Sequence, residues 1–368
     1  MANTEKTKKL LRKYFLSRII LIVKRVSYVQ KIRTEEGAMS SIRDVAKLAG
    51  VSPATVSRVM NGTANVADDK REKVLAAIAE TGFIPNETAR TLFRKSSKTI
   101  GLVIPSIRNP YFTQLAAILD ELSAEQGYRL FLCNVGTDPE KQRSAVQMLE
   151  AANADGIILA SEMDKAEEQL SGCTIPVVAV DTNIRARCVQ ARVYCDYYQG
   201  ARLAMEHLLE CGCEHIVCIK GPQHIFSGRR RYEAYRDICR ERNLPERTVD
   251  CDYDFESGLA MTEQLLRLYP EADGILACND IVAISTYKIL HQKNIPVPDR
   301  IQLAGFDDID LAGLMSPELT TVRQPLRAIA EKAMEVIIRQ PDDAAAQTEY
   351  IFPAELIRRE TTKRRDEQ

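Results

Sequence analysis

Ten polar and aromatic residues in the second part of the sequence stand where short apolar runs end, and their types suit a hydroxyl-rich ligand. They are Asn109, Tyr111, Phe112, Ser161, Asp181, Arg229, Phe255, Asn279, Asp307 and Gln324. Carboxylates accept hydrogen bonds from neighbouring hydroxyl groups, a guanidinium donates to ring and hydroxyl oxygens, and an aromatic ring covers the C–H face of a sugar. The set predicts a binding site for a small polyhydroxylated molecule.

Two members of this set have an alternative interpretation. Asp307 stands directly before Asp308 and is also explained as the cap of a loop. Arg229 and Arg231 lie in the same segment, SGRRRYEAY, and only one of them is needed for a ligand. We expect Arg229 to contact the ligand and Arg231 to be the structural member of the pair.

The apolar runs themselves predict a parallel α/β fold. From Thr99 onward, runs such as TIGLVIP, DGIILAS, DGILACND and IQLAGFD alternate with amphipathic stretches such as 112–126 and 202–210. This alternation is typical of parallel sheets covered by helices. Ligands bind beyond the carboxyl ends of strands in such sheets, so we expect the ten residues to line one cleft.

A different pattern precedes this region. Residues 41–62, SIRDVAKLAGVSPATVSRVMNG, predict two short amphipathic helices joined by a turn. Ser41 and Asp44 form a capping box for the first helix, and Gly50 suits the left-handed turn that ends it. Ser52 caps the second helix. A third helix, expected over about 67–81, completes a small core.

The second helix of this trio leaves small and hydrogen-bonding residues outside the core. They are Ser52, Pro53, Ala54, Thr55, Ser57, Arg58 and Asn61. Such a helix end fits the DNA major groove, where an arginine can contact two guanine acceptors at once. We predict a DNA-reading surface. An ordinary helical hairpin with a solvated face is the alternative.

From about Ser41 to near its end, the sequence resembles the lac repressor family of bacterial transcription regulators. The resemblance is carried by the helix-turn-helix and by the segment GFIPNETARTLFRKSSKTIGLVIP that follows it. The resemblance implies a hinge helix over 86–93 and a leucine, Leu92, that wedges into the minor groove at the operator centre. Ala89 and Arg90 of this hinge are further expected DNA contacts. A helix of about eight residues is too short to be stable alone, so DNA and a partner hinge must support it. Leu92 could instead plug the seam between domains.

The resemblance also implies two doubly wound lobes, as in periplasmic sugar-binding proteins, with three chain crossings between them. The expected parts are a basic extension (1–38), a headpiece (39–85), a hinge and linker (86–98) and an effector-binding and dimerisation domain (99–368), with lobe 1 at about 99–196 and 325–350 and lobe 2 at about 197–324 and 351–357. The ten ligand residues match those of ribose-binding proteins and ribose repressors. Tyr111 and Ser161 depart from that pattern, which leaves the identity of the sugar open.

The distribution of charge agrees with a DNA-binding end and a separate body. Residues 1–40 carry ten Lys or Arg against three acidic residues, 41–98 carry ten against six, and the rest carries thirty against 42. Phosphate neutralisation by the basic end makes DNA binding salt-dependent. The basic extension is interrupted by charges too often to span a bilayer and lacks the features of a signal peptide, so we interpret it as disordered or as a start codon placed too early.

The ten cysteines lie mostly in apolar runs and predict buried, reduced thiols and a cytoplasmic location. Cys211, Cys213 and His215 suggest a metal site, but the C-x-C spacing lacks a second ligand pair, so we expect no metal and no other cofactor. The sequence contains no G-x-S-x-G, no Walker motif and no G-x-G-x-x-G after a strand, which argues against an enzyme.

Three functional classes are compatible with parts of the sequence: a ligand-responsive repressor, an exported sugar-binding protein and an enzyme. Only the first explains both halves of the sequence. We predict a homodimer that binds a palindromic operator and releases it when a ribose-like sugar binds between the lobes, without membrane contact. The end of the sequence, TTKRRDEQ, shows no leucine heptad and predicts a dimer rather than a tetramer. A purine-type co-repressed regulator is the alternative.

Overall fold

The computed structural model describes residues 41–60, 66–83, 96–163, 165–339 and 348–363. The chain divides into two units, residues 1–93 and 94–368, which are treated separately below. Among the described residues, no helix combines the length and the apolar character needed to cross a membrane.

The first unit contains three short helices around a small apolar core. They are α2 (Ile42–Leu48), α3 (Pro53–Met60) and α4 (Asp68–Thr81). The Ser41 hydroxyl accepts from the Asp44 N–H while the Asp44 carboxylate accepts from the Ser41 N–H, so the predicted capping box is present. Gly50 and Gly82 have positive φ values, which let the chain turn after α2 and α4. The core consists of Val45, Ala46, Ala49, Val56, Val59, Val74 and Ala77.

One large apolar side chain of α4 lies outside this core. Leu75 of α4 is 54% exposed, whereas Ala77 is buried. Val74, Ala77 and Ile78 form the side of α4 that packs on the core, and Leu75 lies on the solvent-exposed side of the helix.

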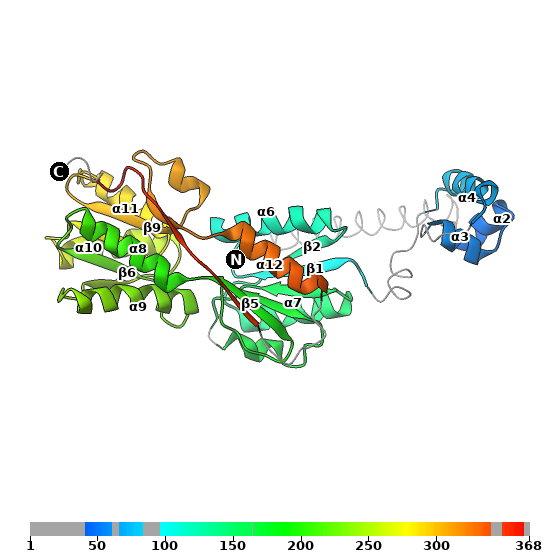
Figure 1. The fold of residues 1–368 in the computed structure, drawn as a ribbon, viewed down its shortest axis with the longest axis horizontal. Helices are drawn as coiled ribbons and strands as arrows, with labels where there is room; N and C mark the ends of the chain where they lie inside the picture. The colour runs from blue at the N-terminus through cyan, green and yellow to red at the C-terminus, as the bar shows by residue number, and fades with distance from the viewer. Residues whose placement is uncertain (1–40, 61–65, 84–95, 164, 340–347, 364–368) are drawn as a thin grey trace, which may run out of the picture. The chain divides into compact units, whose positions relative to one another are not determined.

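The second unit has two six-stranded sheets, each forming the core of one lobe (Figure 1). The first has the order β11-β5-β4-β3-β1-β2 and is parallel throughout. Its strands are β1 (Thr99–Ile104), β2 (Arg129–Asn134), β3 (Gly156–Leu159), β4 (Val177–Val180), β5 (Val189–Cys195) and β11 (Thr348–Phe352). Its helices are α6 (Pro110–Glu125), α7 (Pro139–Ala151), η1 (Ala166–Leu170) and α12 (Leu326–Arg339).

The second sheet has the order β12-β10-β9-β8-β6-β7, with only β12 antiparallel to its neighbour. Its strands are β6 (Ile216–Lys220), β7 (Thr248–Asp250), β8 (Gly274–Ala277), β9 (Gln302–Asp307), β10 (Thr320–Arg323) and β12 (Glu355–Ile357). Its helices are α8 (Tyr197–Glu210), α9 (Phe226–Glu241), α10 (Phe255–Leu268), α11 (Asp280–Gln292) and η2 (Asp310–Gly313).

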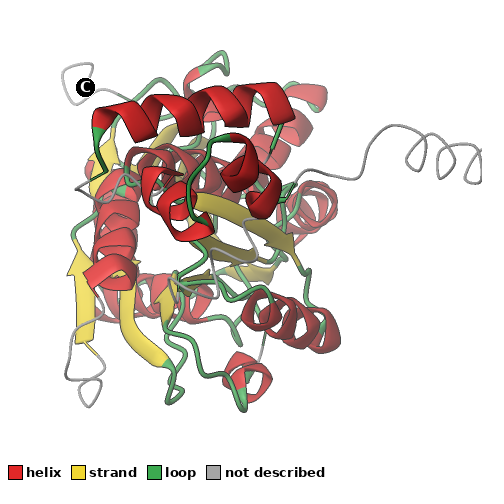
Figure 2. Cartoon of the chain, turned by 90° about the vertical axis from the view of Figure 1, so that its right-hand side faces the viewer, coloured by secondary structure: helices red, strands yellow, loops and turns green. Residues whose placement is uncertain are grey.

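Helices cover both faces of each sheet. Figure 2 shows helices on either side of the strands. In the first lobe, α6 and α12 share one apolar cluster with the sheet, and α7 and η1 share another. In the second lobe, α8 and α9 pack on one face and α10 and α11 on the other. Most central strands are buried along their whole length, which explains their near-continuous apolar sequences. The predicted fold class is confirmed.

The chain crosses between the lobes at residue 196, at 324–325 and at 353–354. The last crossing differs from the prediction by two residues. Ile351 and Phe352 were expected in the second lobe, but they pair with Tyr194 and Cys195 of β5 in the first. The strand register continues through Phe352, and Pro353, which has no N–H for a sheet, follows where pairing stops.

Candidate functional site

The exposed side of α3 carries most of the residues predicted to read DNA. Ser52, Pro53, Ala54 and Arg58 are exposed, while Thr55 and Ser57 are half-buried. The Ser52 hydroxyl accepts a hydrogen bond from the Thr55 N–H at 3.2 Å and so caps the helix. Val56 and Val59 fix the opposite face in the core. The predicted DNA contacts Asn61, Ala89, Arg90 and Leu92 lie outside the described residues.

The second candidate site lies where the strands of the two lobes end. Arg231 of α9 donates from Nη2 to Asp307 Oδ1 at 3.2 Å and from Nη1 to the Cys278 carbonyl at 2.6 Å. Gln324 Nε2 donates to the same Asp307 oxygen at 2.8 Å. The Tyr111 hydroxyl, from the first lobe, donates to Gln324 Oε1 at 3.5 Å. These hydrogen bonds form one chain across both lobes, and all of its side chains are buried.

Asp181 adds a second carboxylate to this cluster. It follows β4 with φ at 58°, a conformation that non-glycine residues rarely adopt outside functional sites and turns. The hydroxyl of Tyr197 donates to Asp181 Oδ1. The Arg231 guanidinium lies 5.2 Å from the centroid of the Tyr197 ring. Asp181 therefore belongs to the same polar centre as Arg231, although it comes from the other lobe.

Aromatic rings surround the Arg231 guanidinium. The Phe306 ring centroid lies 3.8 Å from it, and that of Tyr253 lies 5.8 Å away. Arg231 Nε is buried and has no hydrogen-bond partner among the described residues. A buried donor without a partner is costly, so a ligand oxygen that accepted from Nε would be stabilising.

The two predicted asparagines are N-caps of the helices that follow their strands. Asn109 Oδ1 accepts from the Tyr111 N–H at 3.1 Å, and Asn279 Oδ1 accepts from the Val282 N–H at 2.9 Å. Because the oxygens are engaged in capping, the amide NH₂ groups are what these side chains can offer to a ligand. Phe112 is buried and makes an edge-to-face contact with Tyr111.

The structure reverses the expectation for the two arginines. Arg231 contacts Asp307, whereas Arg229 is half-buried and makes none of the contacts described above. The two residues are two positions apart on α9 and so point about 200° apart around the helix axis. Arg231 is therefore the arginine of the polar centre, and the geometry favours it over Arg229 as the ligand contact.

Ser161 and Phe255 also differ in position from the other seven residues. The Ser161 hydroxyl donates to Gln142 Oε1 at 2.9 Å, so it is engaged within the first lobe. Phe255 is the first residue of α10 and lines the outer part of the cleft, where Lys288 Nζ lies 5.1 Å from its ring centroid. The aromatic residue closer to Arg231 is Tyr253, two residues earlier.

A cavity of about 740 Å³ opens between the lobes outside the polar centre. Small-molecule sites are commonly about 300–1,000 Å³. Both lobes contribute to its walls, which are formed by Pro105, Ser106, Arg108, Asn109, Gly136, Thr137, Glu162, Pro222, His224, Ile225, Asp252, Tyr253, Asp254, Phe255, Glu256 and Ile281. Its size and its polar walls suit a small hydrophilic ligand.

Burial shifts the carboxyl groups of this region toward their neutral forms. It raises the pKa of Asp181 to about 7 and the pKa of Asp307 to about 6, although Arg231 opposes both shifts. Burial, together with repulsion from Asp181 and Asp307, raises the pKa of Glu162 to about 8. A carboxyl group that is neutral part of the time can donate as well as accept, which matches the dual character of sugar hydroxyls.

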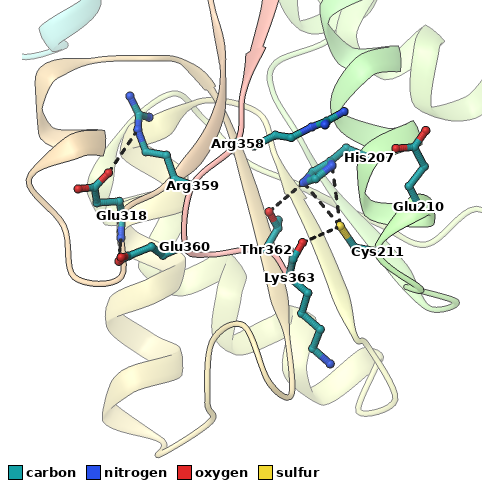
Figure 3. Close-up of a pocket in the computed structure, with 9 residues that line it drawn as sticks. All are labelled: His207, Glu210, Cys211, Glu318, Arg358, Arg359, Glu360, Thr362 and Lys363. Carbon is teal, nitrogen blue, oxygen red and sulfur yellow. Dashed lines mark hydrogen bonds and ion pairs between the residues drawn. The ribbon is translucent and has the colours of Figure 1, made fainter. Parts of the chain in front are cut away.

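A second cavity of about 350 Å³ lies on the second lobe beside the C-terminal segment (Figure 3). His207 Nε2 is 2.8 Å from Thr362 Oγ1, and the Cys211 thiol donates to the Lys363 carbonyl at 3.3 Å. These contacts attach the segment 361–363 to α8. Cys213 instead donates to the Asp273 carbonyl at 3.6 Å.

The side chains considered for a metal site do not converge. His215 Nδ1 is 3.1 Å from Arg247 Nη2, and Cys211 and Cys213 have the separate partners given above. Within the part of the chain that the structure describes, no group of three or more His, Cys, Asp or Glu side chains could hold a metal ion.

Several residues of the polar centre were not identified from the sequence. Phe306, Asp280 and Glu162 each adjoin a predicted residue, so their strand-end position was an available signal. Asp280 Oδ2 accepts from the Ile309 N–H at 2.9 Å and so holds the loop that carries Asp307. Tyr197 has no such position at a strand end. It is the first residue of α8, after the first crossing, and it contacts the polar centre by its hydrogen bond to Asp181.

Family models match both units of the chain. Residues 41–86 match the bacterial regulatory proteins of the lacI family, and residues 205–362 match a periplasmic binding protein-like domain. The headpiece and the two-lobed unit thus define a class: a DNA-binding transcription regulator with a ligand-binding body. The chain belongs to the LacI family of bacterial regulatory proteins.

Individual relatives cover nearly the whole chain. The ribose operon repressor of Halalkalibacterium halodurans is 38% identical over 88% of this chain and 98% of its own length. The HTH-type transcriptional repressor PurR of Haemophilus influenzae is 33% identical over 88% of this chain and 99% of its own. The lac repressor dimer bound to operator and the anti-inducer ONPF is 27% identical, covers 88% of this chain and 99% of its own, and superposes with a TM-score of 0.80.

Proposed function

We propose that this protein represses transcription as a homodimer on a palindromic operator and that a small sugar, bound between the lobes, lowers its operator affinity. The observation that carries the proposal is the buried polar centre of Arg231, Asp307, Gln324 and Asp181, which joins residues of both lobes. It joins acceptors, donors and aromatic faces in the combination that a polyhydroxylated ligand requires. The similarity to ribose operon repressors supports a pentose or a related sugar.

The cleft suits a switch because its hydrogen bonds join residues of both lobes. A ligand can change DNA affinity only if it binds one arrangement of the lobes more tightly than another. We infer that sugar draws the lobes together and changes the contact between the two copies. The hinge segments 86–93 then lose the pairing that supports them, and DNA is released.

Two neighbouring arginines supply a matched test. Arg231→Ala removes the buried guanidinium that contacts Asp307, whereas Arg229→Ala removes the same group from a half-buried position on the same helix. Calorimetry with ribose, other pentoses and hexoses is expected to show binding by the wild type and by Arg229→Ala, and a loss of at least about tenfold in Arg231→Ala. Sugar that tightens operator binding in a gel-shift titration would contradict the inducing direction.

A purine-type co-repressor is the second candidate, and it is favoured by the identity to PurR relatives. A flat base would need to stack on the aromatic residues of the cleft, such as Tyr111 or Tyr253. Hypoxanthine and guanine belong in the same calorimetric panel. Binding of a purine without binding of any sugar, together with tighter operator binding in its presence, would establish this candidate in place of the first.

The location of the protein and the lack of a catalytic role in this proposal follow from its action on chromosomal DNA. We place the protein in the cytoplasm, where its operator is found, and assign it neither a catalytic activity nor a cofactor. The relatives given above are transcriptional repressors, which supports this assignment.

A further inference from the structure

Cys173 and Cys188 are two cysteines of the first lobe whose thiol groups are neighbours. Cys173 precedes β4 and Cys188 directly precedes β5, and these adjacent strands begin with the pairing of Val177 and Val189. Both cysteines contact the same apolar cluster, and each thiol lies close enough to shift the pKa of the other. Both are free thiols in the structure.

Hydrogen bonds hold the backbone on both sides of this thiol pair. The Val177 N–H donates to the Cys188 carbonyl at 2.9 Å, which fixes the start of β5 against the start of β4. Thr174, the residue after Cys173, donates from its N–H and its hydroxyl to Glu150 Oε1 of α7 at 2.6 and 2.9 Å. The two thiols are therefore kept together without a covalent bond between them.

A second pair of neighbouring thiols, Cys251 and Cys278, is placed differently in its sheet. These two thiols also shift each other's pKa, but they follow β7 and β8, and β6 lies between those strands. Two strand spacings correspond to about 9–10 Å, whereas the Cα atoms of a disulfide are about 4.4–6.8 Å apart. Adjacent strands are about 4.8 Å apart, so the geometry favours a disulfide between Cys173 and Cys188.

The environment of Cys188 also favours reaction with an oxidant. The neighbouring Cys173 thiol lowers the pKa of Cys188, although burial opposes this effect, whereas burial raises the pKa of Cys133 in the same lobe. Cys173 is half-buried between exposed residues, so a small oxidant can reach the pair. Peroxides react with thiolates, and oxidant-sensing cysteines commonly lie beside a second thiol that resolves the first product.

We propose that Cys173 and Cys188 form a peroxide-sensitive dithiol that closes to an intramolecular disulfide. The Cys188 thiolate attacks one oxygen of hydrogen peroxide: an S–O bond forms, the O–O bond breaks, and the leaving hydroxide takes a proton from solvent to give water. The Cys173 sulfur then attacks the Cys188 sulfur, so that the S–S bond forms and the S–O bond breaks. The hydroxide that leaves takes the Cys173 proton as a second water. The thiols lose two electrons in total, and the peroxide gains them.

The disulfide closes a loop, 173–188, that contains β4 and Asp181. Both ends of the segment that carries this residue of the polar centre are then joined covalently. In a reducing compartment such a bond is transient, because thiol reductants return it to two thiols. The modification does not depend on which effector the cleft binds.

Differential alkylation of the full chain tests the proposal. The reduced protein is treated with hydrogen peroxide, free thiols are blocked with iodoacetamide in denaturant, and thiols released by dithiothreitol are labelled with N-ethylmaleimide before peptide mapping. Cys173 and Cys188 are expected to acquire the maleimide label together, at least about tenfold faster than Cys133. Before reduction, the oxidised protein is expected to lack the mass of two hydrogen atoms and to run as a single chain on a denaturing gel.

Two serine variants identify the partners of the disulfide. Cys188→Ser leaves Cys173 without a partner and is expected to abolish the maleimide label at Cys173. Cys133→Ser is the matched control, since it removes a buried thiol of the same lobe, and it should leave the label at Cys173 and Cys188 at the wild-type level. Equal thermal unfolding of the reduced proteins shows that the variants compared are folded.

Three results would overturn the proposal. Cys173 and Cys188 could remain thiols at every peroxide concentration at which the chain stays folded. Their disulfide could join two copies of the chain instead of closing within one. The label at Cys173 could also persist in Cys188→Ser, which would assign its partner to another cysteine.

Discussion

Tyr197 and Asp181 are joined by a hydrogen bond at the place where the chain first passes from one lobe to the other. Tyr197 is the first residue of α8, which packs on the second sheet, and its hydroxyl donates to Asp181 beyond β4 of the first sheet. Asp181 lies close enough to Arg231 for the guanidinium to lower its pKa, so this hydrogen bond connects Tyr197 to the polar centre. A change in the angle between the lobes therefore acts on a residue of the polar centre.

We expect Tyr197→Phe to weaken sugar binding. The change removes the hydroxyl that donates to Asp181 and leaves a buried carboxylate oxygen without this partner, which costs about 1–3 kcal/mol or about 5- to 150-fold in affinity. Calorimetry with the best-binding sugar measures the loss. Tyr198→Phe is the control, because the neighbouring hydroxyl donates to Asp237 on α9 at 3.1 Å instead. Equal losses in the two variants would contradict the role of Tyr197.

The stability of the second unit should decrease as pH rises from about 4 to about 8. Glu162, Asp181 and Asp307 have pKa values raised to about 8, 7 and 6 in the folded chain. The folded state therefore binds more protons than the unfolded state in this range, where unfolded carboxyls titrate near 4. The resulting stabilisation is complete below about pH 4 and is lost as pH passes through the folded values.

A comparison of thermal unfolding between the wild type and Glu162→Gln across this pH range isolates the contribution of Glu162 to the pH dependence of stability. The amide does not titrate, so the variant is expected to lose less stability than the wild type between pH 6 and 8.5. Other groups that titrate in both proteins cancel in the difference. Parallel pH profiles for the two proteins would show that Glu162 does not titrate with a raised pKa.

The positions of most site residues could be predicted because parallel strands end at a common edge of the sheet. Asn279 follows β8 and Asp307 ends β9, its neighbour in the sheet, so both are placed at the same edge. Asp181 comes from the other lobe, and the resemblance supplied its place. The capped helices α2 and α3 were also predictable, since their caps and apolar spacing are local features of the sequence.

What could not be predicted depended on helix phase and on contacts between distant segments. The choice between Arg229 and Arg231 requires the rotation of α9 about its axis, and a shift of two residues reverses the direction of a side chain. Phe255 was predicted, whereas Tyr253, before the start of α10 at Phe255, is the aromatic residue near Arg231. Tyr197 is found only when the two lobes are placed together, since its partner is 16 residues earlier in the other lobe.

Arg58 should contribute to the recognition of operator sequence. It is exposed on α3, and an arginine that contacts guanine supplies about 1–3 kcal/mol of discrimination between bases. Arg58→Ala is expected to weaken binding to an operator selected from random sequences more than binding to unselected DNA at the same salt concentration. Arg71→Ala removes an exposed arginine from α4 and should weaken both to a similar, smaller extent. A uniform loss in Arg58→Ala would assign it to the phosphate backbone.

Leu92 was predicted to wedge into the operator centre. Leu92→Ala should reduce specific binding far more than non-specific binding, because the kink that a wedge stabilises is made only at the operator. Fluorescence anisotropy with operator and random duplexes at one salt concentration measures both affinities. Equal losses would favour the alternative in which Leu92 fills the seam between domains.

Exposed apolar side chains on both lobes support assembly with a second copy of the chain. Phe131 and Leu132 are 53% and 45% exposed on β2, the edge strand of the first sheet, and Leu314 after η2 is 77% exposed. We expect Leu314→Glu combined with Leu132→Glu to convert a dimer to monomers in sedimentation velocity.

The monomer should also bind the operator weakly, because it carries one headpiece and loses the gain in effective concentration that two linked headpieces have in the dimer. Leu268→Glu, at an exposed leucine of α10, is the control and should leave the dimer intact. A tetramer of the wild type, or a double variant that remains dimeric, would show that the copies meet through other surfaces.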